Sequence, residues 1–178
     1  MKLWSENNTL NPAQVSIGSH KQALWVCDKG HEWHAQINSI TIGGRCPYCT
    51  GHKILTGFND LGTLHPELLK RWDFKKNTLE PTMIGCGSNK IAWWKCDKGE
   101  QHSYPKAISS ECNHPGCSVC SGHYILPEVN SLSIKSKKLL AYWDYEENKK
   151  LPTEVSFGGS YKAHWKCQQG HKWTATVM

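Results

Sequence analysis

The sequence predicts a small α+β fold that is repeated in tandem. Three nearly identical segments occur in the 178 residues: CDKGHEW begins at residue 27, CDKGEQHSY at residue 96 and CQQGHKW at residue 167. Leu, Ile, Val and Phe make up fewer than a fifth of the chain, which is too little for one large core. The chain also has nine Trp and nine Cys, and a few buried Trp side chains can organise a very small core. These observations indicate several miniature domains.

The repeat extends beyond these segments. A Trp opens each unit, an Asn-x-x-x-Pro motif follows it, and a second Trp lies two residues before the leading Cys. The stretches PELLKRW (66–72) and SKKLLAYW (136–143) place Leu and Trp on one face and predict short connecting helices. We therefore expect repeat 1 over residues 1–58, a linker helix with repeat 2 over residues 59–129, and a linker helix with a truncated repeat 3 over residues 130–178.

Cys and His residues recur at spacings that are typical of zinc ligands. Each of the first two repeats has a Cys and a His around a tight turn, which Gly30 and Gly99 would allow, and then a C-x2-C pair. Two residues are inserted before the His of repeat 2. Since Zn²⁺ favours four such ligands in a tetrahedron, we predict two complete sites, formed by Cys27, His31, Cys46 and Cys49, and by Cys96, His102, Cys117 and Cys120.

Repeat 3 supplies only two ligands, Cys167 and His171, before the sequence ends. Two ligands do not close a structural zinc site. We expect the chain to be a piece of a longer repeat protein. The alternative is that another chain completes the half-site, which would give an oligomer.

The charge of the chain is mildly basic. Lys and Arg total 21 against 15 acidic residues, the net charge is +6, and all but two of the cations are Lys. Lys suits phosphate groups, whereas reading of base edges favours Arg. The alternative is that these lysines only solvate the surface. If nucleic acid is the partner, we expect contacts to its backbone from Lys21, Lys29, Arg45, Lys53, Lys90, Trp93, Lys95, Lys98, Lys162 and Lys166.

Motifs for catalysis are absent from the sequence. There is no G-x-S-x-G, no Walker loop and no H-E-x-x-H, and a zinc ion with four protein ligands has no open position for substrate. We therefore do not expect an enzyme. The sequence also has no apolar run long enough to span a bilayer and no leader-like start. Closely spaced cysteines suit metal binding in a reducing compartment, which predicts a cytoplasmic protein without membrane contact.

The motif W-x-C-x-x-G-H-x-W, followed by CPYC at 46–49 and the linker NDLGTLHPELLKRWD at 59–73, resembles the probable zinc-ribbon repeat family of bacterial, phage and viral proteins. The resemblance implies tandem zinc-ribbon or treble-clef-like modules, that is, zinc-stabilised α+β units built from short β-hairpins with zinc knuckles and joined by short helices. Some members are attached to endonuclease-like domains. This implies a non-catalytic array that binds DNA or RNA, as the targeting part of a larger nuclease or mobile-element protein. A protein–protein scaffold is the alternative.

Overall fold

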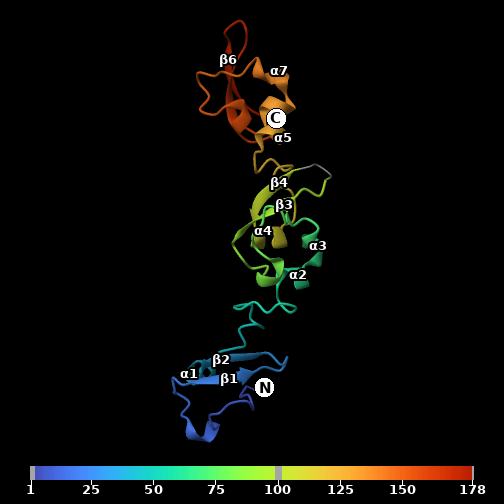
Figure 1. Cartoon of the computed structure of the whole chain (residues 1–178). Helices are drawn as coiled ribbons and strands as arrows, with labels where there is room; N and C mark the ends of the chain where they lie inside the picture. Colours follow the sequence, from blue (N-terminus) through green and yellow to red (C-terminus); the bar gives the residue numbers. More distant parts are fainter. Residues whose placement is uncertain (1–2, 99–101, 178) are drawn as a thin grey trace. The chain divides into compact units, whose positions relative to one another are not determined.

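The computed structural model describes residues 3–98 and 102–177, which form two compact units (Figure 1). The first unit comprises the residues up to Pro66 together with Leu79–Gly87, and the second comprises Glu67–Thr78 and the residues from Ser88 onward. The first unit holds the hairpin of repeat 1, and the second holds the hairpins of repeats 2 and 3. No described helix is long and apolar enough to cross a membrane.

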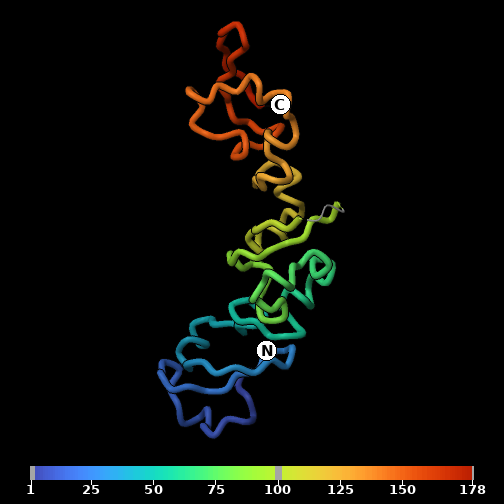
Figure 2. Tube along the Cα trace, turned by 45° about the horizontal axis from the view of Figure 1, so that its top comes forward, coloured from blue at the N-terminus to red at the C-terminus, as the bar shows by residue number. Residues whose placement is uncertain are grey.

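Each repeat contains one antiparallel hairpin, visible in Figure 2 where the trace folds back on itself. Equivalent aromatic residues face each other across the three hairpins, with Trp25 opposite Trp33 in repeat 1. Because side chains alternate along a strand, one face buries Ala23 and Trp25 while the other meets solvent. The strands are β1 (Gln22–Val26) and β2 (Glu32–Gln36), β3 (Ile91–Lys95) and β4 (Ser103–Ala107), and β5 (Lys162–Lys166) and β6 (Lys172–Thr176). The prediction of short hairpins is confirmed.

The helical segments are all short. Each Pro of the Asn-x-x-x-Pro motif begins a 3-10 helix, namely η1 (Pro12–Gln14), η2 (Pro81–Met83) and η3 (Pro152–Glu154). A helix follows the hairpin in repeats 1 and 2, namely α1 (Ile37–Thr41) and α4 (Ile108–Asn113). The linkers contain α2 (Leu61–Leu64), α3 (Pro66–Leu69), α5 (Pro127–Asn130), α6 (Leu132–Lys135) and α7 (Lys137–Leu140).

The linker helices are shorter than the sequence predicts. The expected helix over residues 66–72 ends at Leu69, and the one over residues 136–143 ends at Leu140. The reason is that Trp72 and Trp143 each form an antiparallel β-bridge to the hairpin of their repeat. A β-bridge requires extended backbone, so the helix must end before the Trp.

A pair of perpendicular Trp rings forms the centre of each repeat. The ring centroids of Trp4 and Trp25 are 5.4 Å apart with an interplanar angle of 82°, and the equivalent pairs are 5.1 and 5.4 Å apart at 88°. The indole N–H of Trp25 donates to the carbonyl oxygen of Ala35 at 3.0 Å. Edge-to-face aromatic pairs add about 0.5–1.5 kcal/mol beyond the area that they bury. The Trp side chains therefore replace the missing aliphatic residues.

The Asn of each Asn-x-x-x-Pro motif closes the free edge of the first strand. The side-chain oxygen of Asn8 accepts the Leu24 N–H at 2.7 Å, and its amide donates to the Leu24 carbonyl at 2.7 Å. Asn77 and Asn148 make the same two bonds in repeats 2 and 3. An unpaired strand edge is open to wrong pairing, so this Asn acts as a substitute for a neighbouring strand.

Each linker is anchored by a buried leucine. In the first unit, Leu61 is completely buried and its N–H donates to the Ile84 carbonyl, beside η2, at 2.7 Å. In the second unit, Leu132 is also completely buried and donates to the Val155 carbonyl, beside η3, at 2.8 Å. The same contact thus ties linker and 3-10 segment together in both units.

Repeat 2 has a charged group in its core. Glu111 is completely buried and pairs with Arg71 at 2.7 Å and with Lys106 at 2.9 Å. The Tyr104 hydroxyl accepts from Arg71 and donates to Glu111 at 3.4 Å. Burial raises the pKa of Tyr104, and the Glu111 charge raises it further. The phenol therefore keeps the proton that it donates.

The equivalent positions of repeat 1 are apolar. When the two repeats are aligned on their Trp residues, four contacting positions differ together. Arg71, Tyr104, Lys106 and Glu111 of repeat 2 correspond to Leu3, Trp33, Ala35 and Ile40 of repeat 1. One repeat thus uses an apolar cluster where the other uses an ion-paired one.

Candidate metal centres

The four predicted ligands of repeat 1 converge on one point. The Nδ1 atom of His31 lies 3.5 Å from the Sγ of Cys27, 3.7 Å from that of Cys46 and 3.3 Å from that of Cys49. The Sγ atoms of Cys27 and Cys49 are 3.8 Å apart. Three thiols and one imidazole therefore surround a space of atomic size.

These separations match a tetrahedral zinc ion. With Zn–S bonds of about 2.3 Å and Zn–N bonds of about 2.0–2.1 Å, tetrahedral angles place two sulfurs about 3.8 Å apart and a sulfur and a nitrogen about 3.6 Å apart. The four distances in repeat 1 differ from these values by no more than a few tenths of an ångström. Repeat 1 therefore has a complete Cys3His zinc site.

Repeat 2 builds the same site with the other imidazole nitrogen. The Nε2 atom of His102 lies 3.1 Å from the Sγ of Cys117 and 3.8 Å from that of Cys120, and the Sγ atoms of Cys96 and Cys120 are 3.6 Å apart. All four ligand atoms lie within 4.8 Å of one another, as in repeat 1. His102 thus faces the sulfurs through Nε2, whereas His31 faces them through Nδ1.

Two turns present the ligands in pairs. In repeat 1 the Cys27 N–H donates to the His31 carbonyl, and Gly30, at φ +79°, donates to the Cys27 carbonyl. A positive φ of this kind favours Gly. After the C-x2-C pair, Gly51 and its equivalent Gly122 both have φ +76°. The predicted role of Gly30 is confirmed, whereas Gly99 lies outside the described residues.

The thiols of the sites have altered pKa values. Burial raises the pKa of Cys27, but hydrogen bonds from the backbone N–H groups of Lys29 and His31 and with the neighbouring thiols together lower it by more. Desolvation and the neighbouring thiols raise the pKa of Cys49 to about 11 and that of Cys120 to about 12. Since zinc binds thiolates, the ion must displace these protons, and its affinity will depend on pH.

Repeat 3 contains half of a site. The Sγ of Cys167 lies 3.6 Å from the Nδ1 of His171, close to the distance in repeat 1, and Gly170 has φ +85° in the same turn. Within the described residues, no third Cys, His, Asp or Glu completes the set. The half-site thus has the geometry of a ligand pair but lacks two ligands in this chain.

Two asparagines that the sequence analysis missed support the C-x2-C turns. Asn59 donates to the carbonyls of Tyr48 and Lys53, both at 2.8 Å, and accepts from the Leu55 N–H at 2.7 Å. Asn130 makes the equivalent three bonds at 2.7–2.9 Å in repeat 2. Bonds behind a metal site orient its ligands. The shared Asn-x-Leu sequence, found after both C-x2-C pairs, was the available signal.

The nine predicted cationic contacts are all exposed on the surface, and Trp93 is partly buried. Two of the nine have a side-chain partner among the described residues: Lys29 lies 5.1 Å above the Phe58 ring, and Lys166 is 3.9 Å from Glu146. Trp93 is covered on one face by Lys76, whose Nζ is 4.4 Å from the ring centroid. These residues are distributed over all three repeats and do not form one cluster in the sequence.

Comparison with known families agrees with this geometry. The model of a family described as a probable treble clef zinc finger domain matches residues 1–52, 68–123 and 139–178, which together cover most of the chain. No curated protein matches the chain. Each of the three matches contains one set or half-set of ligands. The chain therefore belongs to the probable treble clef zinc finger family and carries its domain three times.

Proposed function

We propose that the chain is a non-catalytic array that binds nucleic acid through the sugar-phosphate backbone. The observation that carries this proposal is the exposure of the predicted cations and their lack of side-chain partners among the described residues. Seven of the nine are exposed and have no side-chain partner among the described residues. Cations without a partner are free to replace the counterions of a phosphate chain, which is the main source of nucleic-acid affinity.

The hairpins present some of the nine predicted cations on their solvent face. On β5, Lys162 and Lys166 alternate with the buried Ala163 and Trp165, so both lysines lie on the face opposite the core. Between them lies His164, opposite Thr174 of β6. This polar, basic strand face suits a backbone that carries phosphates at regular intervals.

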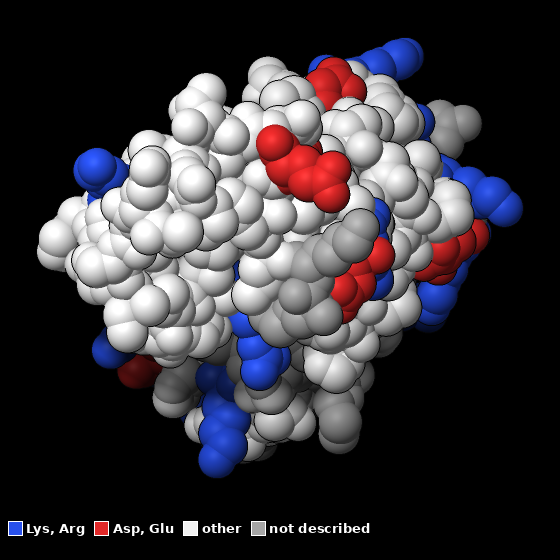
Figure 3. Space-filling view, turned by 90° about the horizontal axis from the view of Figure 1, so that it is seen from below, with Lys and Arg blue, Asp and Glu red and all other residues white. Residues whose placement is uncertain are grey.

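The distribution of charge supports weak sequence preference. Figure 3 shows single Lys and Arg side chains scattered over a face that is mostly uncharged, with acidic residues between them. Only two of the 21 cations are Arg, the residue that best reads base edges. A closed Cys3His zinc site offers no open coordination position, which supports a structural role for the metal and a function without catalysis.

The test is binding of labelled oligonucleotides to the zinc-loaded chain by fluorescence anisotropy, from about 50 to about 200 mM salt. We expect the logarithm of the affinity to fall linearly with the logarithm of the salt concentration. K162Q should reduce that slope by about 0.7–0.9, the value for one phosphate contact. Absence of binding at the lowest salt would refute the proposal.

A matched control lies on the same hairpin. Lys172 is already neutralised by Asp144 and Glu147, both at 3.2 Å. K172Q removes the same charge as K162Q and should leave the salt slope unchanged. An equal effect of both substitutions would mean that only net charge matters.

A protein–protein scaffold is the second candidate, and the charge of the chain favours it, because Lys and Arg outnumber Asp and Glu by only 21 to 15. Binding of a protein partner that persists at high salt would favour this candidate.

A further inference from the structure

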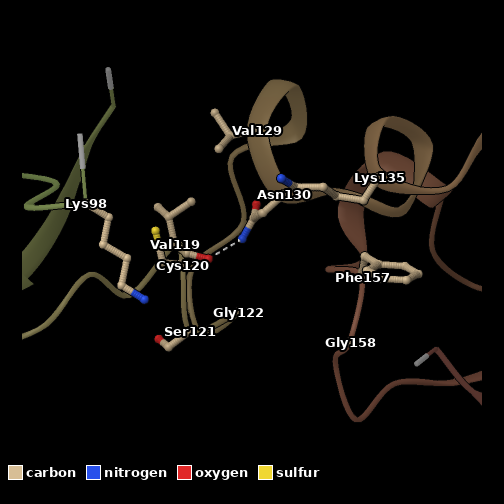
Figure 4. A pocket seen from close by; sticks show the side chains of 10 residues that line it. All are labelled: Lys98, Val119, Cys120, Ser121, Gly122, Val129, Asn130, Lys135, Phe157 and Gly158. Atoms are coloured by element: carbon tan, nitrogen blue, oxygen red, sulfur yellow. Dashed lines mark hydrogen bonds between the residues drawn. The ribbon is translucent and has the colours of Figure 1, made fainter. Parts of the chain in front are cut away.

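A basic cavity lies in the second unit, between the C-x2-C turn of repeat 2 and the segment that follows η3 (Figure 4). Its volume is about 450 Å³, within the range of about 300–1,000 Å³ found for small-ligand sites. Its lining includes Lys98, Ser121, Gly122, Lys135, Phe157 and Gly158. In Figure 4, Lys98 lies on one side of the cavity and Lys135 and Phe157 lie on the other.

Among the described residues, the lining carries positive charge without a neutralising group. Lys98 and Lys135 are both exposed, no acidic residue lines the cavity, and neither ammonium has a carboxylate partner within the described part of the chain. The two other cavities of repeat 2 that contain several lysines also contain carboxylates, Asp97 in one and Asp73 and Glu128 in the other. This cavity is therefore suited to an anion.

The wall of the cavity is fixed by hydrogen bonds. The side-chain amide of Asn130 donates to the Val119 carbonyl at 2.7 Å, and the backbone carbonyl of Asn130 accepts the Phe157 N–H at 3.1 Å. The Ser156 hydroxyl donates to the Gly122 carbonyl at 3.3 Å. The C-x2-C turn, the linker and the segment that contains Phe157 are thus held together. The conformational entropy that the cavity loses when a ligand binds is therefore small.

The corresponding positions around the linker of repeat 1 are different. Lys29 aligns with Lys98, but its ammonium lies over the Phe58 ring. In the first linker, Leu64 occupies the position equivalent to Lys135 of the second linker. Cys86 occupies the position equivalent to Phe157. The combination of two free lysines and an aromatic ring is therefore a particular feature of the second linker and not a general property of the repeat.

We propose that this cavity binds single-stranded nucleic acid, with one phosphodiester between Lys98 and Lys135 and the adjacent base stacked on Phe157. Phe157 is 42% exposed, so its ring is accessible to a base. A basic groove beside an aromatic ring is the usual arrangement for single strands, whose bases are free to stack. The inference rests on the proposed function and names a specific site for it.

The experiment uses the full zinc-loaded chain and labelled single-stranded DNA, single-stranded RNA and duplex DNA. K98A/K135A should lower single-strand affinity at least tenfold and reduce the salt slope by about 0.7. F157L should lower single-strand affinity about 5- to 150-fold, the range for loss of one stacked base, and leave duplex affinity unchanged. The DNA and RNA arms identify which strand the site prefers.

The matched control is K137A/K138A, which removes two exposed lysines from the neighbouring α7 outside the cavity. This variant should change single-strand affinity less than threefold, and each variant should retain the zinc content of the parent chain. If the parent binds but K98A/K135A and F157L behave like the control, the cavity inference is refuted and the proposed function stands. If the parent binds no oligonucleotide, the proposed function and the cavity inference both fail.

Discussion

Replacing Glu111 by Gln should destabilise repeat 2 by about 3 kcal/mol. Its carboxylate is completely buried and neutralises Arg71 and Lys106, whose side chains are only 12% and 20% exposed. Gln keeps the shape but removes the carboxylate partner of Lys106 and, among the described residues, leaves Arg71 with Asp97 alone, at 3.9 Å. Removal of one partner of a buried ion pair costs about 3–5 kcal/mol. We expect the lower value because the amide oxygen still accepts a hydrogen bond.

Hydrogen exchange followed by mass spectrometry measures this effect repeat by repeat. A loss of about 3 kcal/mol should speed the exchange of the protected amides of β3 and β4 about 150-fold, since about 1.4 kcal/mol corresponds to a factor of ten. The amides of β1 and β2, in the other unit, serve as an internal control and should not change. An acceleration of less than tenfold would show that the ion pairs contribute little stability.

A second variant separates loss of charge balance from loss of packing. Converting all four positions to the residues of repeat 1, as R71L/Y104W/K106A/E111I, removes every charge of the network together. Replacing a whole buried ion-pair network by packed apolar residues is often neutral or stabilising. Exchange in β3 and β4 should therefore return to within tenfold of the parent rate. If this variant exchanges as fast as E111Q, the apolar residues do not pack there as they do in repeat 1.

Three further results are expected. Metal analysis by mass spectrometry should find about two zinc ions per chain, and chelation should abolish the protected amides of the hairpins, because the cores cannot close alone; fewer than two ions would contradict the ligand assignment. Zinc affinity, measured by competition with a chromophoric chelator, should rise with pH through the neutral range. The reason is that the raised pKa values of Cys49 and Cys120 keep these thiols protonated in the metal-free chain. An affinity that does not change with pH would contradict this. Asn59→Ala and Asn130→Ala should each destabilise the adjacent C-x2-C turn by about 2–3 kcal/mol, because each removes three hydrogen bonds to backbone groups. Hydrogen exchange measures this loss. Equal exchange rates before and after substitution would show that the turn is stable without these bonds.

The zinc ligands could be predicted from the sequence because their chemistry restricts spacing. A Cys and a His around a tight turn, followed by C-x2-C, leaves few other arrangements that bring four ligands together. The choice of imidazole nitrogen could not be predicted, because the spacings C-x3-H and C-x5-H do not fix which nitrogen faces the sulfurs. That choice depends on the direction from which each ring approaches the metal.

The linkers were predicted less well, for a physical reason. Local periodicity correctly indicated helix near Leu68 and Leu139, but the helices end early because the next Trp must join a hairpin as extended backbone. That requirement arises from a partner that is about 22 residues away in the sequence. A pattern read over one turn of helix contains no information about such a partner.

The ion-paired core of repeat 2 could not be recognised from the shared repeat motif alone. Arg71 and Glu111 are 40 residues apart, and each alone resembles an ordinary surface charge. Only comparison with Leu3 and Ile40 of repeat 1 shows that two contacting positions changed together. The signal was thus present in the sequence, but the comparison had to be made between repeats and at positions outside the shared motif.

This difference between repeats has a consequence for folding. A chain with nearly identical segments can pair a strand or linker of one repeat with the core of another, which is a known failure of repeat proteins. If the segment that contains Leu3 occupied the core of repeat 2, Glu111 would lose its pairing with Arg71, and an incompletely paired charge would be buried at a cost of several kcal/mol. If the segment that contains Arg71 entered the core of repeat 1, its guanidinium would meet Ile40 instead of a carboxylate. The ion-paired core therefore disfavours both exchanges. The Trp pairs, which all three repeats share, and the complete zinc sites, which repeats 1 and 2 share, supply stability without distinguishing repeat 1 from repeat 2.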